Sequence, residues 1–366
     1  MTSYAKDRGR TDAVEVSAPK LLEELVQQAE RAGASDIHLQ MRGKCADVAL
    51  RLDGVMAPVE ELSADVAGRI FGRIKFLARL KTYQESLPQD GRIAHEELKS
   101  QNDVRVATYP TVTGEKIVLR LFSAESAKTL DQIEFPEAAR AELEKFLRQS
   151  SGLLLLTGPA GSGKTTTIYA CLRQLAGCGG RHIITVEDPV EQIVPCTMQT
   201  EINEAIGLDF ARAARHLLRQ DPQVFIIGEI RDDETAQLAV RAGLTGHVVI
   251  STLHAGSCNG VFERLLAMCG DFSAVAGAMD LVLNQRLIRR LCVECDGGGC
   301  GRCLRTGYSG RVPLVEWLRV NEQTRGQIRR REMAALTPVR TLEASARALV
   351  NAGITNEAEF RRIFGL

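Results

Sequence analysis

The stretch LLLLTGPAGSGKTTT, residues 153–167, decides the fold of this chain. Its leucines predict a strand buried on both faces, and the residues after them fit the pattern G-x-x-x-x-G-K-T of a phosphate-binding loop at every position. In such a loop, backbone N–H groups surround phosphate oxygens, the lysine adds positive charge, and the threonine hydroxyl binds Mg²⁺. A chance glycine turn is the alternative, and the order of strand, loop and helix argues against it. The predicted nucleotide contacts are Gly158, Pro159, Ala160, Gly161, Ser162, Gly163, Lys164, Thr165 and Thr166, with Thr165 on the Mg²⁺ ion.

Length and composition predict two domains and a small module. The 366 residues exceed one ordinary core, and 45% hydrophobic with 25% charged residues are typical globular values. No apolar run reaches the roughly 18 residues that span a bilayer. The N-terminus MTSYAKDRGRTD lacks the apolar stretch of an export signal, which favours the cytoplasm. Lys plus Arg and Asp plus Glu number 46 each, so no net field draws the chain onto nucleic acid.

The residues before the phosphate loop predict a domain of the α+β class. The polar N-terminus, residues 1–17, is predicted to be disordered, and apolar residues at helical spacing predict helices from Pro19 and over 63–81. Helices on one face of a mostly antiparallel sheet make a domain over 18–122, and a charged linker, 123–150, follows. Strands are predicted where apolar and polar residues alternate, at 37–41, 46–52, 104–108 and 117–121.

From residue 151 to 290, apolar strands alternate with helices, which predicts an α/β core with a parallel sheet and a site at the carboxyl ends of its strands. Glu187 and Asp188 follow the strand HIITV, and Glu229 follows VFIIG. Singly, each acid could be a helix cap or a surface charge. Together, beside a phosphate loop, they can hold Mg²⁺ and orient or deprotonate water. His254 follows a third strand and could sense a γ-phosphate, whereas His247, at the start of that strand, could equally be an interior imidazole.

Four segments of this core resemble the signature boxes of the GspE/PilB family, the ATPases of type II secretion and type IV pilus assembly. The resemblance runs in unbroken order from about residue 20 to the end of the chain. In the core it covers the phosphate loop, ITVEDPVE (184–191), RQDPQVFIIGEIRDDETA (219–236) and AGLTGHVVISTLHA (242–255). In the first domain it covers SDIHLQ (35–40), RLDG (51–54), LPQDGRI (87–93) and DVRVATYPTVTGEKIVLRLF (103–122).

The resemblance implies a RecA-like P-loop ATPase core, an α+β PAS-like N-terminal domain and a flexible linker, assembled as a homo-hexamer that uses ATP and Mg²⁺. It implies that Glu187 and Glu229 are the catalytic carboxylates and that His247 and His254 belong to the histidine box.

Two arginines of the first domain, Arg105 and Arg120, match family arginines that reach the nucleotide when this domain closes on the core. An arginine on a mobile domain can neutralise charge on the γ-phosphoryl group and so couple hydrolysis to movement. Without the resemblance, both would be assigned as charges on the wet face of a sheet.

Four cysteines lie within CVECDGGGCGRC, residues 292–303. Two C-x-x-C pairs supply four thiolates, enough for a closed tetrahedral zinc site, and the glycines permit the tight return. The family pattern also has two C-x-x-C pairs near this position. Here only four residues separate the pairs, far fewer than is usual in the family, so a projecting loop between the pairs is not expected. An iron–sulfur cluster or an empty dithiol pair is the alternative. Structural Zn²⁺ is expected on Cys292, Cys295, Cys300 and Cys303, in a module over 291–310, followed by a helical region over 311–366.

These observations lead to the hypothesis of a cytoplasmic ATPase, peripheral to the inner membrane, that passes its motion to an inner-membrane platform protein and assembles a pseudopilus or pilus. No AIRNLIRE-like segment is present, which disfavours pilus retraction. Because SDIHLQ begins at residue 35, the chain resembles a short form without the extra N-terminal domain of many secretion members.

Two rival functions remain. A RecA-like DNA translocase or helicase requires a basic, aromatic-studded channel, whereas aromatics are 5% and the net charge is zero, so no nucleic-acid partner is expected. A non-hydrolysing regulatory subunit would lack Lys164 or one of the acids, and neither is missing.

Overall fold

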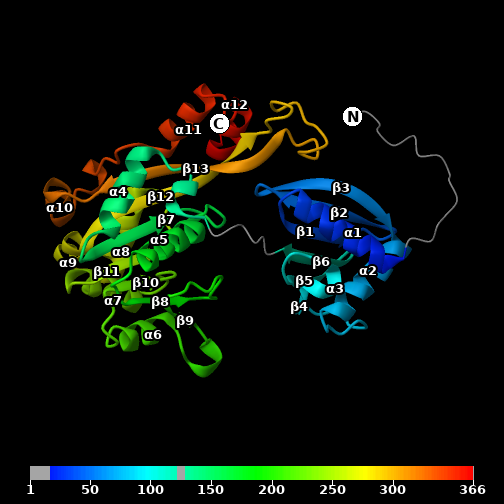
Figure 1. Cartoon of the computed structure of the whole chain (residues 1–366), viewed down its shortest axis with the longest axis horizontal. Coiled ribbons are helices and arrows are strands. Elements are labelled where there is room, and N and C mark those ends of the chain that lie inside the picture. Colours follow the sequence, from blue (N-terminus) through cyan, green and yellow to red (C-terminus); the bar gives the residue numbers. More distant parts are fainter. Residues whose placement is uncertain (1–16, 122–127, 366) are drawn as a thin grey trace. The chain divides into compact units, whose positions relative to one another are not determined.

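A computed structural model describes residues 17–121 and 128–365. Except for Ser17, the N-terminus predicted to be disordered lies outside the described residues, as do residues 123–127 of the predicted linker. Among the described residues, no helix is long and apolar enough to cross a lipid bilayer. The chain divides into two units, which comprise Met1–Glu125 with Cys292–Ser309 and Ser126–Leu291 with Gly310–Leu366 (Figure 1).

An antiparallel sheet of six strands, in the order β3-β2-β1-β6-β5-β4, forms the main part of the first unit. Its inward side chains, such as Ile37 and Leu50, pack against the apolar stripes of helices α1 and α2. On the other face, Arg51 and Arg120 both pair with the buried Asp36. The elements are α1 (Ala18–Arg31), β1 (Ala34–Met41), β2 (Cys45–Leu52), β3 (Val55–Ser63), α2 (Ala64–Leu77), β4 (Gln89–Ile93), α3 (His95–Leu98), β5 (Val104–Thr111) and β6 (Gly114–Leu121).

The second unit contains a seven-stranded sheet in the order β13-β12-β7-β11-β10-β8-β9, in which β12, β7, β11, β10, β8 and β9 pair in parallel. Leu153 and Leu155 of β7 face a core built with α6 to α9, while Leu154 and Leu156 face a core built with α4 and α5. Burial on both faces explains the uninterrupted leucine run. The elements up to β11 are η1 (Leu130–Gln132), α4 (Glu137–Leu147), β7 (Gly152–Thr157), α5 (Lys164–Cys178), β8 (Ile183–Glu187), β9 (Met198–Glu201), η2 (Glu204–Ile206), α6 (Phe210–Leu217), β10 (Val224–Ile227), α7 (Asp233–Leu244) and β11 (Val248–Thr252).

The region 311–366 does not begin as a helix. Strand β13, Tyr308–Arg319, runs beside β12, Met279–Leu291, and its Trp317 is only 3% exposed. A strand covered on both faces shows an apolar run without alternation, so the sequence pattern alone does not separate it from a buried helix. The remaining elements are α8 (Cys258–Cys269), α9 (Phe272–Ala278), α10 (Glu322–Arg329), η3 (Met333–Ala335), α11 (Leu342–Asn351) and α12 (Glu357–Phe364).

Candidate active site

The phosphate loop runs from the end of β7 to the first residue of α5, as the sequence predicts. Gly163, which caps α5, has a φ of +88°, a left-handed conformation that favours glycine. The Lys164 ammonium donates hydrogen bonds to the carbonyl oxygens of Gly158 at 2.8 Å and Pro159 at 2.9 Å. Burial lowers the pKa of Lys164, and the charge of Glu229 opposes this effect. The lysine therefore lies at the mouth of the loop, where an anion would replace the two carbonyl groups as its partner.

The loop lies against Gln285 of β12. A Cβ on Gly158, whose φ is +136°, would lie 2.1 Å from the backbone oxygen of Gln285, and one on Gly163 would lie 2.7 Å from its side-chain nitrogen. Both positions thus require glycine, because Gln285 leaves no room for a Cβ atom and because the backbone has a positive φ. Gln285 is 2% exposed, and its side-chain oxygen accepts a hydrogen bond from Thr167 at 3.0 Å.

A cavity of about 300 Å³ opens beside the loop at the carboxyl ends of the parallel strands. This is the expected position for a ligand in such a sheet. Of the predicted site residues, it is lined by Ala160, Gly161, Lys164, Thr165, Glu187, Asp188, Glu229 and His254. The other lining residues are Ile168, Tyr169, Pro189, Glu191, Phe210, Ile226, Gly228, Arg231 and Thr252.

Glu187, at the tip of β8, is 8% exposed, and its carboxylate accepts hydrogen bonds from three of the described side chains. One oxygen accepts from Thr185 at 2.5 Å and from Gln199 at 3.0 Å, and the other accepts from the Tyr169 hydroxyl. This carboxylate is therefore held in one orientation at the cavity wall.

Glu229 belongs to a second network of charged side chains. Its two oxygens bind the imidazole of His254 at 2.8 Å and the guanidinium of Arg231 at 2.9 Å. Arg231 also pairs with Asp188 at 3.0 Å, and so joins the acids that follow β8 and β10. The hydrogen bond from Arg231 to Glu229 raises the pKa of this arginine further. The groups at the two strand ends are thus coupled electrostatically.

The remaining core residues of the prediction do not line this cavity. Gly158, Pro159, Ser162, Gly163 and Thr166 belong to the loop and the first turn of α5. His247 lies at the opposite end of β11 from His254, where its Nδ1 contacts the carbonyl oxygen of Ala242 at 3.0 Å and the Thr245 hydroxyl at 3.2 Å. The structure therefore does not bring His247 to the cavity.

Arg105 and Arg120 lie opposite each other on β5 and β6 of the first unit. Arg120 donates to Asp36 at 3.0 Å while 66% of its side chain stays exposed. Burial alone raises the pKa of Asp36, but the hydrogen bonds from Arg120 and Ser35 and the charges of Arg120 and Arg51 together outweigh burial and leave the pKa below its usual value. The arginine pair is thus presented on the face of the sheet away from α1 and α2.

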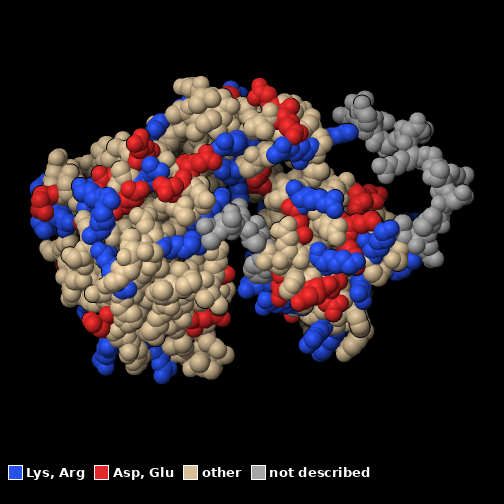
Figure 2. Space-filling view, viewed as in Figure 1, with Lys and Arg blue, Asp and Glu red and all other residues tan. Residues whose placement is uncertain are grey.

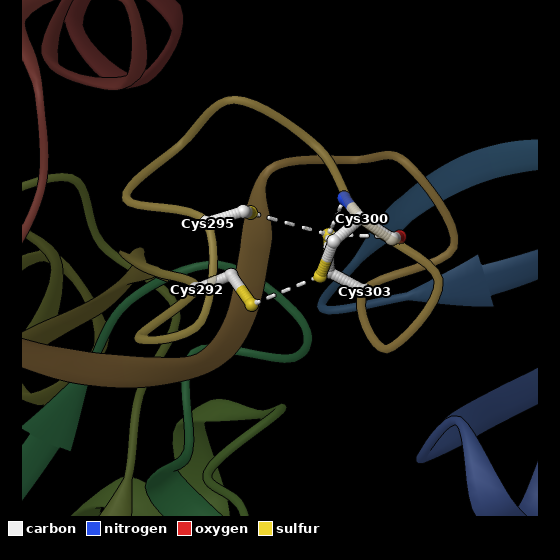
Figure 3. A group of neighbouring side chains, drawn as sticks. All are labelled: Cys292, Cys295, Cys300 and Cys303. Carbon is white, nitrogen blue, oxygen red and sulfur yellow. Dashed lines mark hydrogen bonds between the residues drawn. The ribbon is translucent and has the colours of Figure 1, made fainter.

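The four sulfurs of Cys292, Cys295, Cys300 and Cys303 lie within 4.8 Å of one another (Figure 3). Three of the pairs are 3.8–3.9 Å apart. Four thiolates around a tetrahedral zinc, at Zn–S distances of about 2.3 Å, have S···S separations of about 3.8 Å, so the cluster fits that ion. Burial opposes ionisation of Cys303, but N–H groups of Cys300 and Gly307 donate to its sulfur and lower its pKa to about 6.

Two functional candidates escaped the sequence prediction: Tyr169 and Gln285. Arg231 did not, since it follows the strand VFIIG two residues after Glu229 and belongs to the predicted strand-end groups. Tyr169 lies four residues after Thr165 on α5, and a helical projection places the two on one face. Gln285 had no local signal, because the loop that it supports is more than 100 residues earlier in the sequence.

Comparison with known proteins gives a consistent result. The family model described as Type II/IV secretion system protein matches residues 12–362. The type II secretion system protein HxcR of Pseudomonas aeruginosa is 38% identical over 360 residues, which cover 94% of this chain and 76% of the relative. The type IV pilus assembly ATPase TfpB of Acinetobacter baylyi is 36% identical over 341 residues, 85% of this chain and 58% of the relative. The solved structure of the Legionella pneumophila ATPase DotB has a TM-score of 0.72 at 20% identity, over 97% of this chain and 98% of that one, and so shares its α/β fold.

Proposed function

This chain belongs to the type II/IV secretion system protein family, and from that premise we propose that it hydrolyses ATP to power assembly of a type II secretion pseudopilus or a type IV pilus. The observation that carries this proposal is the cavity that brings the phosphate-loop residues Lys164 and Thr165 beside the acids Glu187 and Glu229. A secretion protein and a pilus-assembly ATPase among the relatives support the same motor class.

The roles in the reaction follow from the positions of the groups. Lys164 leaves the carbonyls of Gly158 and Pro159 and binds the phosphates of ATP, whose remaining oxygens are bound by loop N–H groups. Glu229 takes the proton of the attacking water, while bond cleavage releases ADP and phosphate. His254, bonded to Glu229, detects whether the γ-phosphate is present.

Mg²⁺ fits the residues that surround the cavity. The Thr165 hydroxyl would supply one oxygen ligand, and Asp188, Glu187 and Glu229 would supply carboxylates for direct or water-mediated contact. When bound, the ion neutralises charge on the β and γ phosphates. His247 is left out of the nucleotide contacts because it lies at the far end of β11.

The finer architecture is part of the proposal. The 18–122 domain is PAS-like, and 151–290 with α4 and β13 is a RecA-like core. Because α4 packs into the core of the second unit, the linker is shorter than the predicted 123–150. The four cysteines hold a structural Zn²⁺, and the chain assembles as a homo-hexamer that binds an inner-membrane platform protein from the cytoplasm. Basic and acidic side chains are interspersed on the face drawn in Figure 2, which supports a protein partner over nucleic acid.

An ATPase assay on the purified chain tests the reaction. Lys164→Ala and Glu229→Gln should each lower kcat by at least about a hundredfold, since each removes a charge that the reaction uses. The matched controls are Lys145→Ala on α4 and Glu263→Gln on α8, both exposed and outside the cavity. Light scattering with and without nucleotide measures the molar mass of the assembly and so tests the proposed hexamer. Wild-type rates in both site variants would overturn the proposal.

A further inference from the structure

The orientation of Glu187 depends on side chains that come from two other elements. Tyr169 on α5 donates to one oxygen, and Gln199 on β9 donates to the other at 3.0 Å. Thr185, two residues earlier on the same strand, donates to the second oxygen at 2.5 Å. A carboxylate offers about four lone-pair positions, and three are occupied here. One position is left for a further donor, such as a single water in the cavity.

The Tyr169 hydroxyl also holds the segment that follows Glu187. It accepts hydrogen bonds from the backbone N–H groups of Glu191 at 2.9 Å and Gln192 at 3.2 Å while it donates to Glu187. Tyr169 is 3% exposed, and burial raises its pKa well above the usual value, so the phenol keeps its proton and remains a donor. It lies five residues after Lys164, about 7.5 Å along the same helix.

Gln199 holds the same segment from the β9 side. Its amide nitrogen donates to Glu187 and to the carbonyl oxygen of Gln192, each at 3.0 Å. Its amide oxygen accepts from the backbone N–H of Val194 at 2.7 Å. Tyr169 and Gln199 therefore fix both oxygens of Glu187 and anchor the chain after it.

We propose that Tyr169 and Gln199 are positioning residues for ATP hydrolysis, which hold the Glu187 carboxylate toward the single water that it can still accept. The inference rests on the proposed ATPase function, in which Glu187 supplies a carboxylate at the nucleotide site for direct or water-mediated contact with Mg²⁺. Since Tyr169 and Lys164 share helix α5, the phenol fixes the distance between this carboxylate and the phosphate loop. Rate depends steeply on such placement, because a misplacement of about 1 Å can cost about a hundredfold.

Steady-state kinetics of the full chain test the proposal. Tyr169→Phe keeps the ring and removes only the hydroxyl, so kcat should fall at least about tenfold while KM for ATP stays within about twofold. Tyr83→Phe, which removes the hydroxyl of an 83% exposed tyrosine, is the matched control and should behave as wild type. In a Glu187→Gln background, adding Tyr169→Phe should lower kcat no further, because the hydroxyl acts through that carboxylate.

An unchanged kcat in Tyr169→Phe, a raised KM alone, or a double variant slowed by the product of both single effects would each overturn the proposal. If Tyr169→Phe does not fold, Gln199→Leu must show the same loss of kcat, and an unchanged kcat there overturns it. Failure of the proposed function looks different: Lys164→Ala or Glu187→Gln then hydrolyses ATP at the wild-type rate. A slow Glu187→Gln beside a fast Tyr169→Phe refutes only the positioning role.

Discussion

The side-chain oxygen of Gln285 accepts a hydrogen bond from the hydroxyl of Thr167 at 3.0 Å, and both side chains are buried. The same glutamine places its backbone oxygen where a side chain on Gly158 would begin. Strand β12 therefore supports the phosphate loop from behind, and the loop has little room to adopt another conformation.

Substitution of Gly158 by alanine should disrupt that support. The new Cβ would meet the Gln285 backbone oxygen at 2.1 Å in a conformation that disfavours alanine, so the loop must move. We expect nucleotide Kd to rise at least about tenfold and stability to fall by about 2 kcal/mol. Gly177→Ala on α5 meets no atom within 4 Å and is the control, expected to stabilise by about 0.5–1 kcal/mol. Binding of a fluorescent nucleotide measures the Kd, and thermal unfolding measures the stability. A wild-type Kd for Gly158→Ala would contradict the expectation.

The buried carboxylate of Glu359 should make stability depend on pH. It is 0% exposed and accepts hydrogen bonds from Arg289 and Arg362. Burial alone raises the pKa of Glu359, but the two arginines outweigh this effect and hold it below the ordinary 4.5. Its contribution is therefore complete above about pH 4.5 and is lost as pH falls through the lower pKa of the folded state.

Urea unfolding of Glu359→Gln measures this contribution. The variant should lose about 3 kcal/mol at pH 7, mainly because the largely buried Arg289 loses its counter-charge, and this loss should shrink only below about pH 4.5. Glu357→Gln, on the same helix but with an exposed carboxylate, should lose less than about 1 kcal/mol. Equal losses in the two variants would refute the buried pair as the source.

The four-cysteine cluster should contain one zinc per chain. Elemental analysis of freshly purified protein should give about one equivalent, and Cys303→Ser should lower both zinc content and thermal stability, since metal binding contributes to folding. Cys178→Ser removes an exposed cysteine outside the cluster and should leave both unchanged. Less than about half an equivalent in the wild-type chain would argue against the site.

The exposed arginines of the first unit should act on turnover. Arg105→Ala and Arg120→Ala should each lower kcat at least about tenfold if they neutralise charge on the transferred phosphoryl group. Arg42→Ala is the control, since Arg42 forms an exposed pair with Asp47 at 2.9 Å elsewhere in the same unit. Wild-type kcat in both site variants would remove the two arginines from the mechanism.

Patterns within a few residues predicted the phosphate loop and the acids at the strand tips, because loop, strand and charge follow one another directly in the chain. The edge strands β3 and β4 escaped because their side chains are largely exposed, so no apolar alternation marks them. Tyr169 and Gln285 escaped for another reason. Their roles come from contacts with Glu187 and Gly158, which only the folded sheet brings near.

The segment Cys292–Ser309, which contains the four cysteines of the cluster, belongs to the first unit. The residues on either side of this segment, Leu291 and Gly310, belong to the second unit. Leu304 of the segment packs against the core of the N-terminal sheet. A fragment that stops at Glu125 consequently lacks a piece of its own unit, and a cut between Glu125 and Ser126 leaves two further covalent crossings intact. Fragments of this chain should therefore be designed from the contacts in the folded structure and not from the order of the sequence. An exchange of the first unit between relatives must replace Met1–Glu125 and Cys292–Ser309 together.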